Sequence, residues 1–99
     1  MSKHVLVVDG MLSGTGVRDG INGGYLELQG IGISDSLRRR INAWLSRYEN
    51  AHYHQYENMN EASLLDQDGV EIARMLRTEL PTATVKYFSS AIMKEIGID

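Results

Sequence analysis

Glycine is concentrated in the first third of this chain of 99 residues, and this distribution constrains the fold more than any other feature. Glycine permits positive φ angles and close backbone contacts, but its conformational entropy disfavours regular helix. Eight of the ten glycines fall before residue 33: Gly10, Gly14, Gly16, Gly20, Gly23, Gly24, Gly30 and Gly32. We therefore expect short strands and shaped loops in this part, and amphipathic helices in the sequence that follows it.

Composition limits the class of protein. The length corresponds to one domain, residues 1–99, and 42% hydrophobic with 23% charged residues is typical of a folded globular domain. The absence of cysteine excludes a disulfide framework and suits a reducing compartment. The apolar run at residues 5–8 is too short for a signal peptide, and no segment approaches the ~20 apolar residues of a membrane span. We expect a cytoplasmic protein without a membrane partner.

The charge balance bears on the kind of partner. The formal net charge is −3 at pH 7. Nucleic-acid-binding domains usually present a basic face, so we expect no direct contact with nucleic acid. An acidic domain suits a basic protein partner, because opposite electrostatic potentials accelerate the encounter.

Three segments have the pattern of β-strands. Residues 4–9 contain the continuous apolar run and are predicted to be buried on both faces. Residues 11–24 are predicted to be a loop, and residues 25–29, which partly alternate between apolar and polar side chains, a second strand. Residues 82–88 are the third. The first and third strands can lie side by side and parallel, because the intervening helices supply the crossover.

A first amphipathic helix is expected to begin at a Ser34 or Asp35 cap and to continue to about residue 56. Its apolar positions recur with the 3.6-residue period of a helix. They are Leu37, Ile41, Trp44, Leu45 and Tyr48. We expect a break over residues 57–61, with Asn60 as the cap of the next helix.

The second helix is predicted over residues 62–80, and a proline follows it. Gly69 lies on its apolar face, where the missing side chain can admit a large neighbour, and Trp44 is the expected one. Alternatively, the helix begins at Asp66 or Asp68, and Gly69 belongs to its first turn.

A short C-terminal helix is predicted after Ser89 or Ser90. Its apolar residues are Ile92, Met93 and Ile96. The predicted order of elements is therefore β-β-α-α-β-α. We predict an α/β domain, with α+β as the alternative, in which two long amphipathic helices pack on a small three-stranded sheet.

The sequence Gly14-Thr15-Gly16 follows the first strand, as glycines do in phosphate-binding loops. The segment after it cannot begin a good helix, and without a helix N-terminus a phosphate lacks its usual amide donors. We therefore interpret these residues as a structured loop. Polar side chains that could serve a catalytic site also gather here, but nothing in the sequence sets their geometry, and we predict no catalytic residues. They are His4, Asp9, Ser13, Thr15 and Asp19.

Two further patterns have an ordinary explanation. His52 and His54 are two residues apart and point in different directions on a helix, so they do not form a metal site together. The three arginines at residues 38–40 spread over ~200° of a helix and are expected to balance nearby acids in solvent. We predict no metal ligands and no cofactor.

Tyrosines and acids alternate near the end of the first helix. Tyrosine is enriched at protein interfaces, and acids beside it can pair with a basic partner. The residues that carry this pattern are Glu49, Tyr53, Tyr56, Glu57 and Glu61, with Tyr48 a core residue. The pattern is either a protein interface or a polar helix end.

Several pieces of the chain together resemble small bacterial immunity proteins, which are encoded beside polymorphic or contact-dependent growth inhibition toxins. The pieces are Gly14-Thr15-Gly16-Val17-Arg18-Asp19, Gly23-Gly24-Tyr25, Leu37…Ile41…Trp44…Tyr48, Leu65-Asp66-x-x-Gly69 and Glu79-Leu80-Pro81…Val85-x-Tyr87-Phe88-Ser89. The resemblance implies residence in the cytoplasm, no catalysis, and tight one-to-one binding of a toxin domain, often a nuclease.

We therefore expect an antitoxin that neutralises a cognate toxin domain by occluding its active site. The expected partner-binding residues are Thr15, Arg18, Asp19, Glu49, Tyr53, Tyr56 and Glu57. One alternative is a small enzyme or ligand-binding domain that uses Asp9, Thr15, Arg18 and Asp19 in the loop at residues 10–24. Another is an adaptor that dimerises through the helix carrying the tyrosines.

Overall fold

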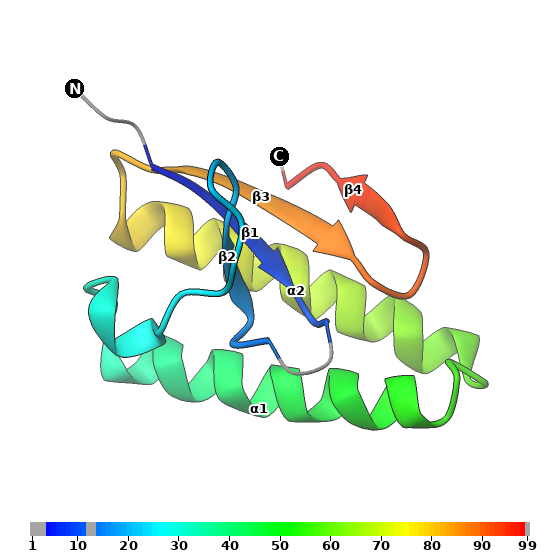
Figure 1. The fold of residues 1–99 in the computed structure, drawn as a ribbon. Helices are drawn as coiled ribbons and strands as arrows, with labels where there is room; N and C mark the ends of the chain where they lie inside the picture. The colour runs from blue at the N-terminus through cyan, green and yellow to red at the C-terminus, as the bar shows by residue number, and fades with distance from the viewer. Residues whose placement is uncertain (1–3, 12–13, 99) are drawn as a thin grey trace.

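A computed structural model describes residues 4–11 and 14–98 of the protein (Figure 1). Over this part, the chain folds into a four-stranded mixed sheet with two helices packed on it, in the order β-β-α-α-β-β. The elements are β1 (Val5–Asp9), β2 (Val17–Asp19), α1 (Asp35–Tyr53), α2 (Met59–Glu79), β3 (Thr84–Ser89) and β4 (Lys94–Ile96). The predicted α/β architecture with two long helices is confirmed.

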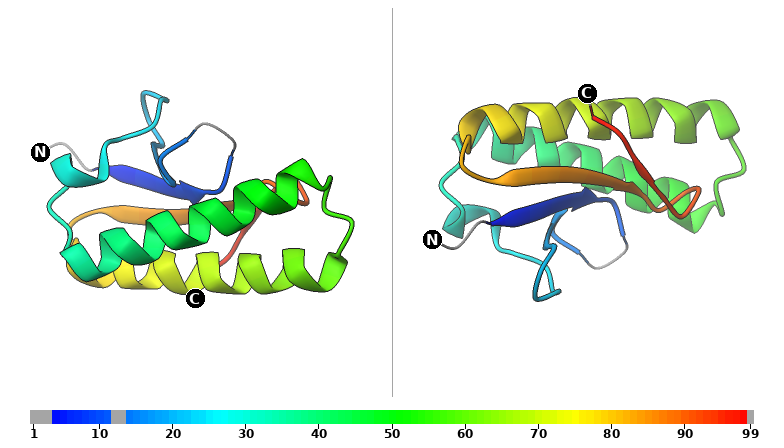
Figure 2. Two further views of the ribbon diagram at one scale, coloured as in Figure 1. Left: turned by 90° about the horizontal axis from the view of Figure 1, so that it is seen from below. Right: turned by 90° about the horizontal axis from the view of Figure 1, so that it is seen from above.

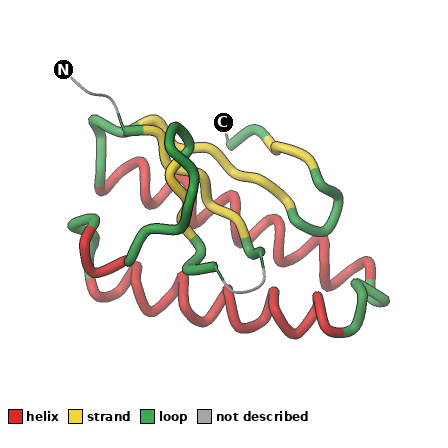
Figure 3. The backbone as a smooth tube through the Cα atoms, viewed as in Figure 1, coloured by secondary structure: helices red, strands yellow, loops and turns green. Residues whose placement is uncertain are grey.

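The sheet has the strand order β2-β1-β3-β4, with the two long strands at its centre. β1 and β3 are parallel and pair Leu6 with Val85 and Val8 with Tyr87, as the crossover through the helices predicts. The short strands β2 and β4 pair antiparallel to the outer sides of β1 and β3. Both helices lie on one face of this sheet, so the molecule has a strand layer and a helix layer (Figures 2 and 3).

The helix caps set the ends of α1 and α2. The Ser34 hydroxyl accepts a hydrogen bond from the Leu37 amide at 3.2 Å, which confirms the predicted start of α1. α1 ends at residue 53 rather than 56, because Gln55 and Tyr56 adopt positive φ angles of 54° and 56°. α2 begins earlier than predicted, since Asn58 and not residue 60 caps it by accepting from the Glu61 amide. The alternative start of α2 at residue 66 or 68 is wrong.

The core lies between the sheet and the helices, and Trp44 is at its centre. The Trp44 ring makes an edge contact with Tyr48 at 5.3 Å between centroids, and its Nε1–H donates to the Leu65 carbonyl at 2.8 Å. The glycine at position 69 is buried as predicted, but the prediction that it admits Trp44 is wrong. A Cβ at Gly69 would overlap the Tyr87 ring, so the glycine lets α2 approach β3.

The prediction of a second strand at residues 25–29 is wrong. The strand beside β1 is Val17–Asp19, inside the segment predicted to be a loop, because Val17 is fully buried next to Val8. Tyr25 forms only an isolated bridge with Arg18, and Leu28–Gly30 forms a 3-10 turn that buries Leu28. One buried side chain and the pairing with β1 outweigh the weak alternation that suggested the later segment.

The predicted C-terminal helix is also wrong. The chain turns after β3 and returns as β4, which pairs Ile96 with Tyr87 and makes the sheet four-stranded within the described residues rather than three-stranded. Met93 adopts a positive φ of 54°, which no helix accommodates. The side chains of Ile92 and Met93 are 50% and 63% exposed, so their helical spacing does not reflect a buried face.

Candidate functional site

The predicted loop residues Thr15 and Asp19 are engaged in contacts within the loop. The Thr15 hydroxyl donates to the Leu26 carbonyl at 2.5 Å. Asp19 Oδ1 accepts from the amides of Ile21 at 2.8 Å and Asn22 at 3.0 Å. Hydrogen bonding from the Asn22 backbone, more than any other contact, lowers the pKa of the Asp19 carboxyl. These two side chains shape the turn after β2.

Arg18 belongs to a closed polar cluster around the carboxylate of Asp9, which is only 2% exposed at the end of β1. Asp9 Oδ2 accepts from Arg18 Nε at 3.0 Å, and Oδ1 accepts from the Tyr25 hydroxyl at 2.5 Å and the Met11 amide at 3.1 Å. The Arg18 guanidinium lies 5.9 Å from the centroid of the Phe88 ring. Burial and the bond to Asp9 raise the pKa of the Tyr25 hydroxyl. This cluster fixes the loop to the sheet.

The polar residues considered for catalysis are brought together only in part. His4 precedes β1 and lies near Asp19, with which it lines a pocket, whereas Asp9 is at the other end of that strand. Ser13 lies outside the described residues. The Gly14-Thr15-Gly16 sequence leads into β2 and not into a helix, so no helix N-terminus follows it in the described part of the loop. The structure therefore assembles neither a catalytic set nor a phosphate loop from the described residues of this region.

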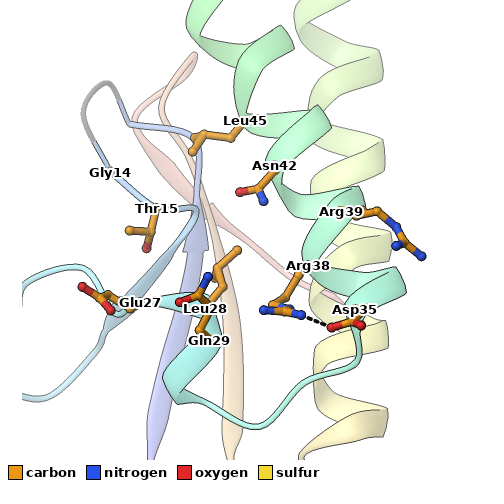
Figure 4. Close-up of a pocket in the computed structure, with 10 residues that line it drawn as sticks. All are labelled: Gly14, Thr15, Glu27, Leu28, Gln29, Asp35, Arg38, Arg39, Asn42 and Leu45. Carbon is orange, nitrogen blue, oxygen red and sulfur yellow. Dashed lines mark hydrogen bonds and ion pairs between the residues drawn. The ribbon is translucent and has the colours of Figure 1, made fainter.

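A pocket of about 660 Å³ lies between the loop and α1 (Figure 4). Glu27, Arg38 and Asn42 line it, together with Thr15. The Arg38 guanidinium pairs with Asp35, and Arg39 projects away from the pocket (Figure 4). The Thr15 hydroxyl and Arg38 Nη2 have partners within the chain, whereas the buried Nε of Arg38 has no hydrogen-bond partner among the described residues. The pocket therefore offers a ligand one unpaired buried donor.

All three arginines at residues 38–40 were predicted to balance nearby acids, and the structure confirms this for Arg38 and Arg40. Besides the Arg38 pair, Arg40 Nη2 lies 3.3 Å from Glu71 Oε2, which links α1 to α2. The histidines are also placed as ordinary helix-end residues: His52 Nδ1 is 3.2 Å from the Tyr56 hydroxyl, and His54 is the exposed C-cap of α1. Among the residues that the structure describes, no group of three or more His, Asp and Glu side chains could bind a metal ion.

The predicted helix-end residues gather where α1 turns into α2 (Figure 1). Tyr53 is 76% exposed, Glu57 is exposed and Glu49 is half-buried. Tyr56 differs from Tyr53, because its ring folds back onto Tyr48 at 6.0 Å between centroids and burial raises its pKa. Tyr53 is thus free to contact a partner, and Tyr56 supports the turn beneath it.

Charge separates this end from the rest of the molecule. Residues 48–73 contain none of the ten lysines and arginines. They contain six of the thirteen carboxylates: Glu49, Glu57, Glu61, Asp66, Asp68 and Glu71. Two of these pair with arginines of α1, Asp68 with Arg47 at 3.1 Å and Glu71 with Arg40. The side chains of the three glutamates at positions 49, 57 and 61 have no hydrogen bond or ion pair with another described residue.

We call the surface formed by Glu49, Tyr53, Glu57, Met59 and Glu61 the acidic end. Met59 adds a side chain that is 68% exposed. Sequence reasoning identified three of these residues as partner-binding, but it did not include Met59 or Glu61 among the binding residues. The missing signal was the stretch without lysine or arginine, which is visible in the sequence and spans the whole connection between the helices.

A second polar cluster, which sequence reasoning missed, surrounds Asp66 on α2. Asp66 Oδ1 accepts from the hydroxyls of Tyr48 at 2.8 Å and Tyr87 at 2.6 Å, and Oδ2 accepts from the Ser89 hydroxyl at 2.7 Å. Burial raises the pKa of Tyr48 to about 12 and raises that of Tyr87 further. Two tyrosines at core positions were the available signal, since a buried phenol needs a hydrogen-bond partner.

Comparisons of the chain with known protein families, with curated proteins and with solved structures find no match. Neither of the helices in the described part of the chain is long and apolar enough to cross a membrane. The acidic end, the loop and the two carboxylate clusters are therefore the candidate functional features of the molecule.

Proposed function

We propose that this protein is a non-catalytic immunity protein that binds a cognate bacterial toxin domain and covers its active site, with a nuclease as the expected class of toxin. The observation that carries the proposal is the acidic end. It presents three carboxylates without partners among the described residues, beside two exposed, largely apolar side chains, Tyr53 and Met59. The resemblance of the chain to immunity proteins supports the same function and a cytoplasmic location.

The physical basis of the proposal is complementarity to a basic cleft. A nuclease needs positive charge to bind the phosphate backbone of its substrate. The four carboxylates of residues 48–73 that pair with no described lysine or arginine create a negative field that steers such a partner and speeds association. Tyr53 and Met59 then provide apolar contact area, since aromatic residues and methionine are enriched at the centres of interfaces.

The loop contributes to this proposal through its shape. Thr15, Arg18 and Asp19 tie the described residues 15–26 together by hydrogen bonds to Leu26, Asp9 and the amides of the turn after β2. A segment that is already held by such bonds loses little entropy on binding, so its exposed backbone can form a second contact with the toxin. We expect substitutions of these three residues to act on the loop first and on binding through it.

The test begins with affinity purification of the tagged protein from its source cells, followed by mass spectrometry and expression of the captured domain. We expect a domain with a basic surface that is toxic alone and harmless when this protein is co-expressed. A captured domain whose toxicity is unchanged by co-expression would contradict the proposal.

Matched charge variants then locate the contact. Replacing the three glutamates of the acidic end by glutamine should slow association at least tenfold and reduce protection, because steering depends on these charges. The control replaces three exposed carboxylates elsewhere, with the changes Glu27→Gln, Asp35→Asn and Glu95→Gln. Equal loss of association in both triple variants would show that net charge, and not the acidic end, governs binding.

A further inference from the structure

A groove runs beside the acidic end, between the first half of α2 and the turn that joins β3 to β4. It has a volume of about 630 Å³. Its walls include the apolar side chains of Met59, Val70, Ile92 and Ile96, and the carboxylate of Asp66 lies among them. Met59 and Ile92 are 68% and 50% exposed, so the apolar rim is open to solvent. The groove thus combines apolar walls with one acidic group.

Asp66 has hydrogen-bond donors but no cationic partner in the part of the chain that the structure describes. The three side chains that donate to it are the neutral hydroxyls of Tyr48, Tyr87 and Ser89. No lysine or arginine in the described ranges, 4–11 and 14–98, forms an ion pair with it. Arg74 also lines the groove, but it is eight residues along α2, about 12 Å away at the rise of a helix, and its Nε–H donates to the Ile98 carbonyl.

The hydrogen bonds leave room for one further donor. A carboxylate has roughly four lone-pair positions, two on each oxygen. The two tyrosine hydroxyls use those of Oδ1, whereas Oδ2 accepts only from Ser89. A positively charged nitrogen donor would satisfy both the free lone-pair position on Oδ2 and the unbalanced negative charge of the carboxylate.

We propose that this groove receives a lysine or arginine side chain of the protein partner, with Asp66 as its counter-ion. The aliphatic part of such a side chain packs along apolar walls while its charged end reaches the carboxylate. Arg74 at the far end repels a cation there and directs it to the Asp66 half. This inference rests on the proposed function, because a partner with a basic surface carries such side chains.

The direct test uses single-residue probes and needs no toxin. The amide signals of the ¹⁵N-labelled protein are followed by NMR during titration with Nα-acetyl-lysine methylamide, its arginine analogue and its norleucine analogue. We expect saturable shifts in residues 59–70 and 89–97, with a dissociation constant on the order of 1–10 mM for a probe of this size. The norleucine probe, which lacks the charge, should bind at least tenfold more weakly. Shifts of equal size at all surface carboxylates would overturn the proposal.

A pair of serine variants makes the test specific to the groove. Ser63→Arg introduces a guanidinium one turn before Asp66, where it fills the groove and supplies the missing charge without removing an acceptor from the tyrosines. It should abolish probe binding. Ser46→Arg, on an exposed position of α1, adds the same charge outside the groove and should leave binding unchanged. Undiminished probe binding by the Ser63 variant would overturn the proposal.

The same variants separate this inference from the proposed function. If the toxin binds the Ser63→Arg variant as tightly as the unmodified protein, the groove is not part of the interface, and the inference fails while the immunity function stands. If lysine and arginine probes bind in the groove but no toxin is neutralised, the immunity function fails. The groove would then be a site for small cationic molecules, which overturns the protein-partner part of the inference.

Discussion

Asp9 and Asp66 each lie at the centre of a polar cluster, but only the Asp9 cluster includes a cation that balances the carboxylate. Each accepts hydrogen bonds from tyrosine, Asp9 from Tyr25 and Asp66 from Tyr48 and Tyr87. Asp9 also pairs with Arg18 at 3.0 Å, so its charge is balanced within the chain. Asp66 lies beside an open groove and has no such partner among the described residues.

The difference indicates that the Asp9 cluster stabilises the fold, whereas the Asp66 carboxylate is still able to bind a cation. A buried ion pair with its hydrogen bonds complete has nothing left to offer a ligand, and its residues serve the loop that they join. A carboxylate that only neutral hydroxyls contact still attracts a cation from outside. The Asp9 cluster is therefore closed, whereas Asp66 and the acidic end form the part of the molecule that we propose to bind a partner.

The largest expected effect comes from removing Asp66. Asp66→Ala removes the acceptor of three hydroxyls, of which those of Tyr48 and Tyr87 belong to fully buried side chains. The Tyr48 and Ser89 hydroxyls, 3.3 Å apart, can still bond to each other, which leaves the Tyr87 donor and one donor of that pair unpaired. Since each buried donor left unpaired costs about 1–3 kcal/mol, we expect the free energy of unfolding to fall by about 4 kcal/mol. Urea unfolding followed by the fluorescence of Trp44, the only tryptophan, measures it. Asp66→Asn keeps one carbonyl acceptor and should lose about half as much. A loss below about 1 kcal/mol for the alanine variant would show that the hydroxyls find other partners.

Asp9→Asn should have a smaller effect than Asp66→Ala. The amide oxygen still accepts from Tyr25, and the Arg18 side chain, which is 35% exposed, can turn into solvent when its counter-ion is lost. We expect a loss of about 2 kcal/mol in the free energy of unfolding. In a double-mutant cycle with Arg18→Gln, the loss in the double variant should be smaller than the sum of the two single losses, because both substitutions remove the same ion pair. Strict additivity would mean that Asp9 and Arg18 contribute independently.

The elements that bring these clusters together were predictable to different degrees. The 3.6-residue spacing of Leu37, Ile41 and Tyr48 predicts α1, and the continuous apolar run predicts β1, because many consecutive residues repeat the same pattern. β2 and β4 have three residues each, too few for a period to be visible. Their formation depends on pairing with β1 and β3, which is a property of the folded chain.

The site was predictable only where a single segment carries it. Glu49, Tyr53 and Glu57 are close in sequence, so their grouping is visible before folding. Asp66 receives its hydrogen bonds from residues 48, 87 and 89, which meet only when α1, α2 and β3 pack together. The same packing brings Gly69 against Tyr87 instead of the larger ring expected there.

Alkaline pH should weaken the Asp66 cluster by a further, smaller amount. Burial raises the pKa of Tyr48 from 10 to about 12, so the folded protein retains a proton that the unfolded chain releases. The stabilisation is complete below pH 10 and is lost as the pH rises through 10 toward 12. We expect about 1 kcal/mol lost from this residue at pH 11. Urea unfolding from pH 8 to 11 measures it. Tyr48→Phe should reduce the loss by about that amount, while Tyr25, Tyr56 and Tyr87, whose pKa values are also raised, retain the remainder. An unchanged slope in that variant would assign the effect to other tyrosines.

The smallest expected effect on stability tests the difference between the closed Asp9 cluster and the acidic end. Replacing Glu49, Glu57 and Glu61 by glutamine removes three charges without described partners from a region of one sign, so the free energy of unfolding should rise by about 0.5 kcal/mol at low salt. The gain should vanish near 1 M salt, where screening acts over about 3 Å. A loss of stability instead would mean that the acidic end is held by intramolecular contacts, like the Asp9 cluster. A gain in stability together with weaker toxin binding is the result expected of charges that serve binding at the expense of folding.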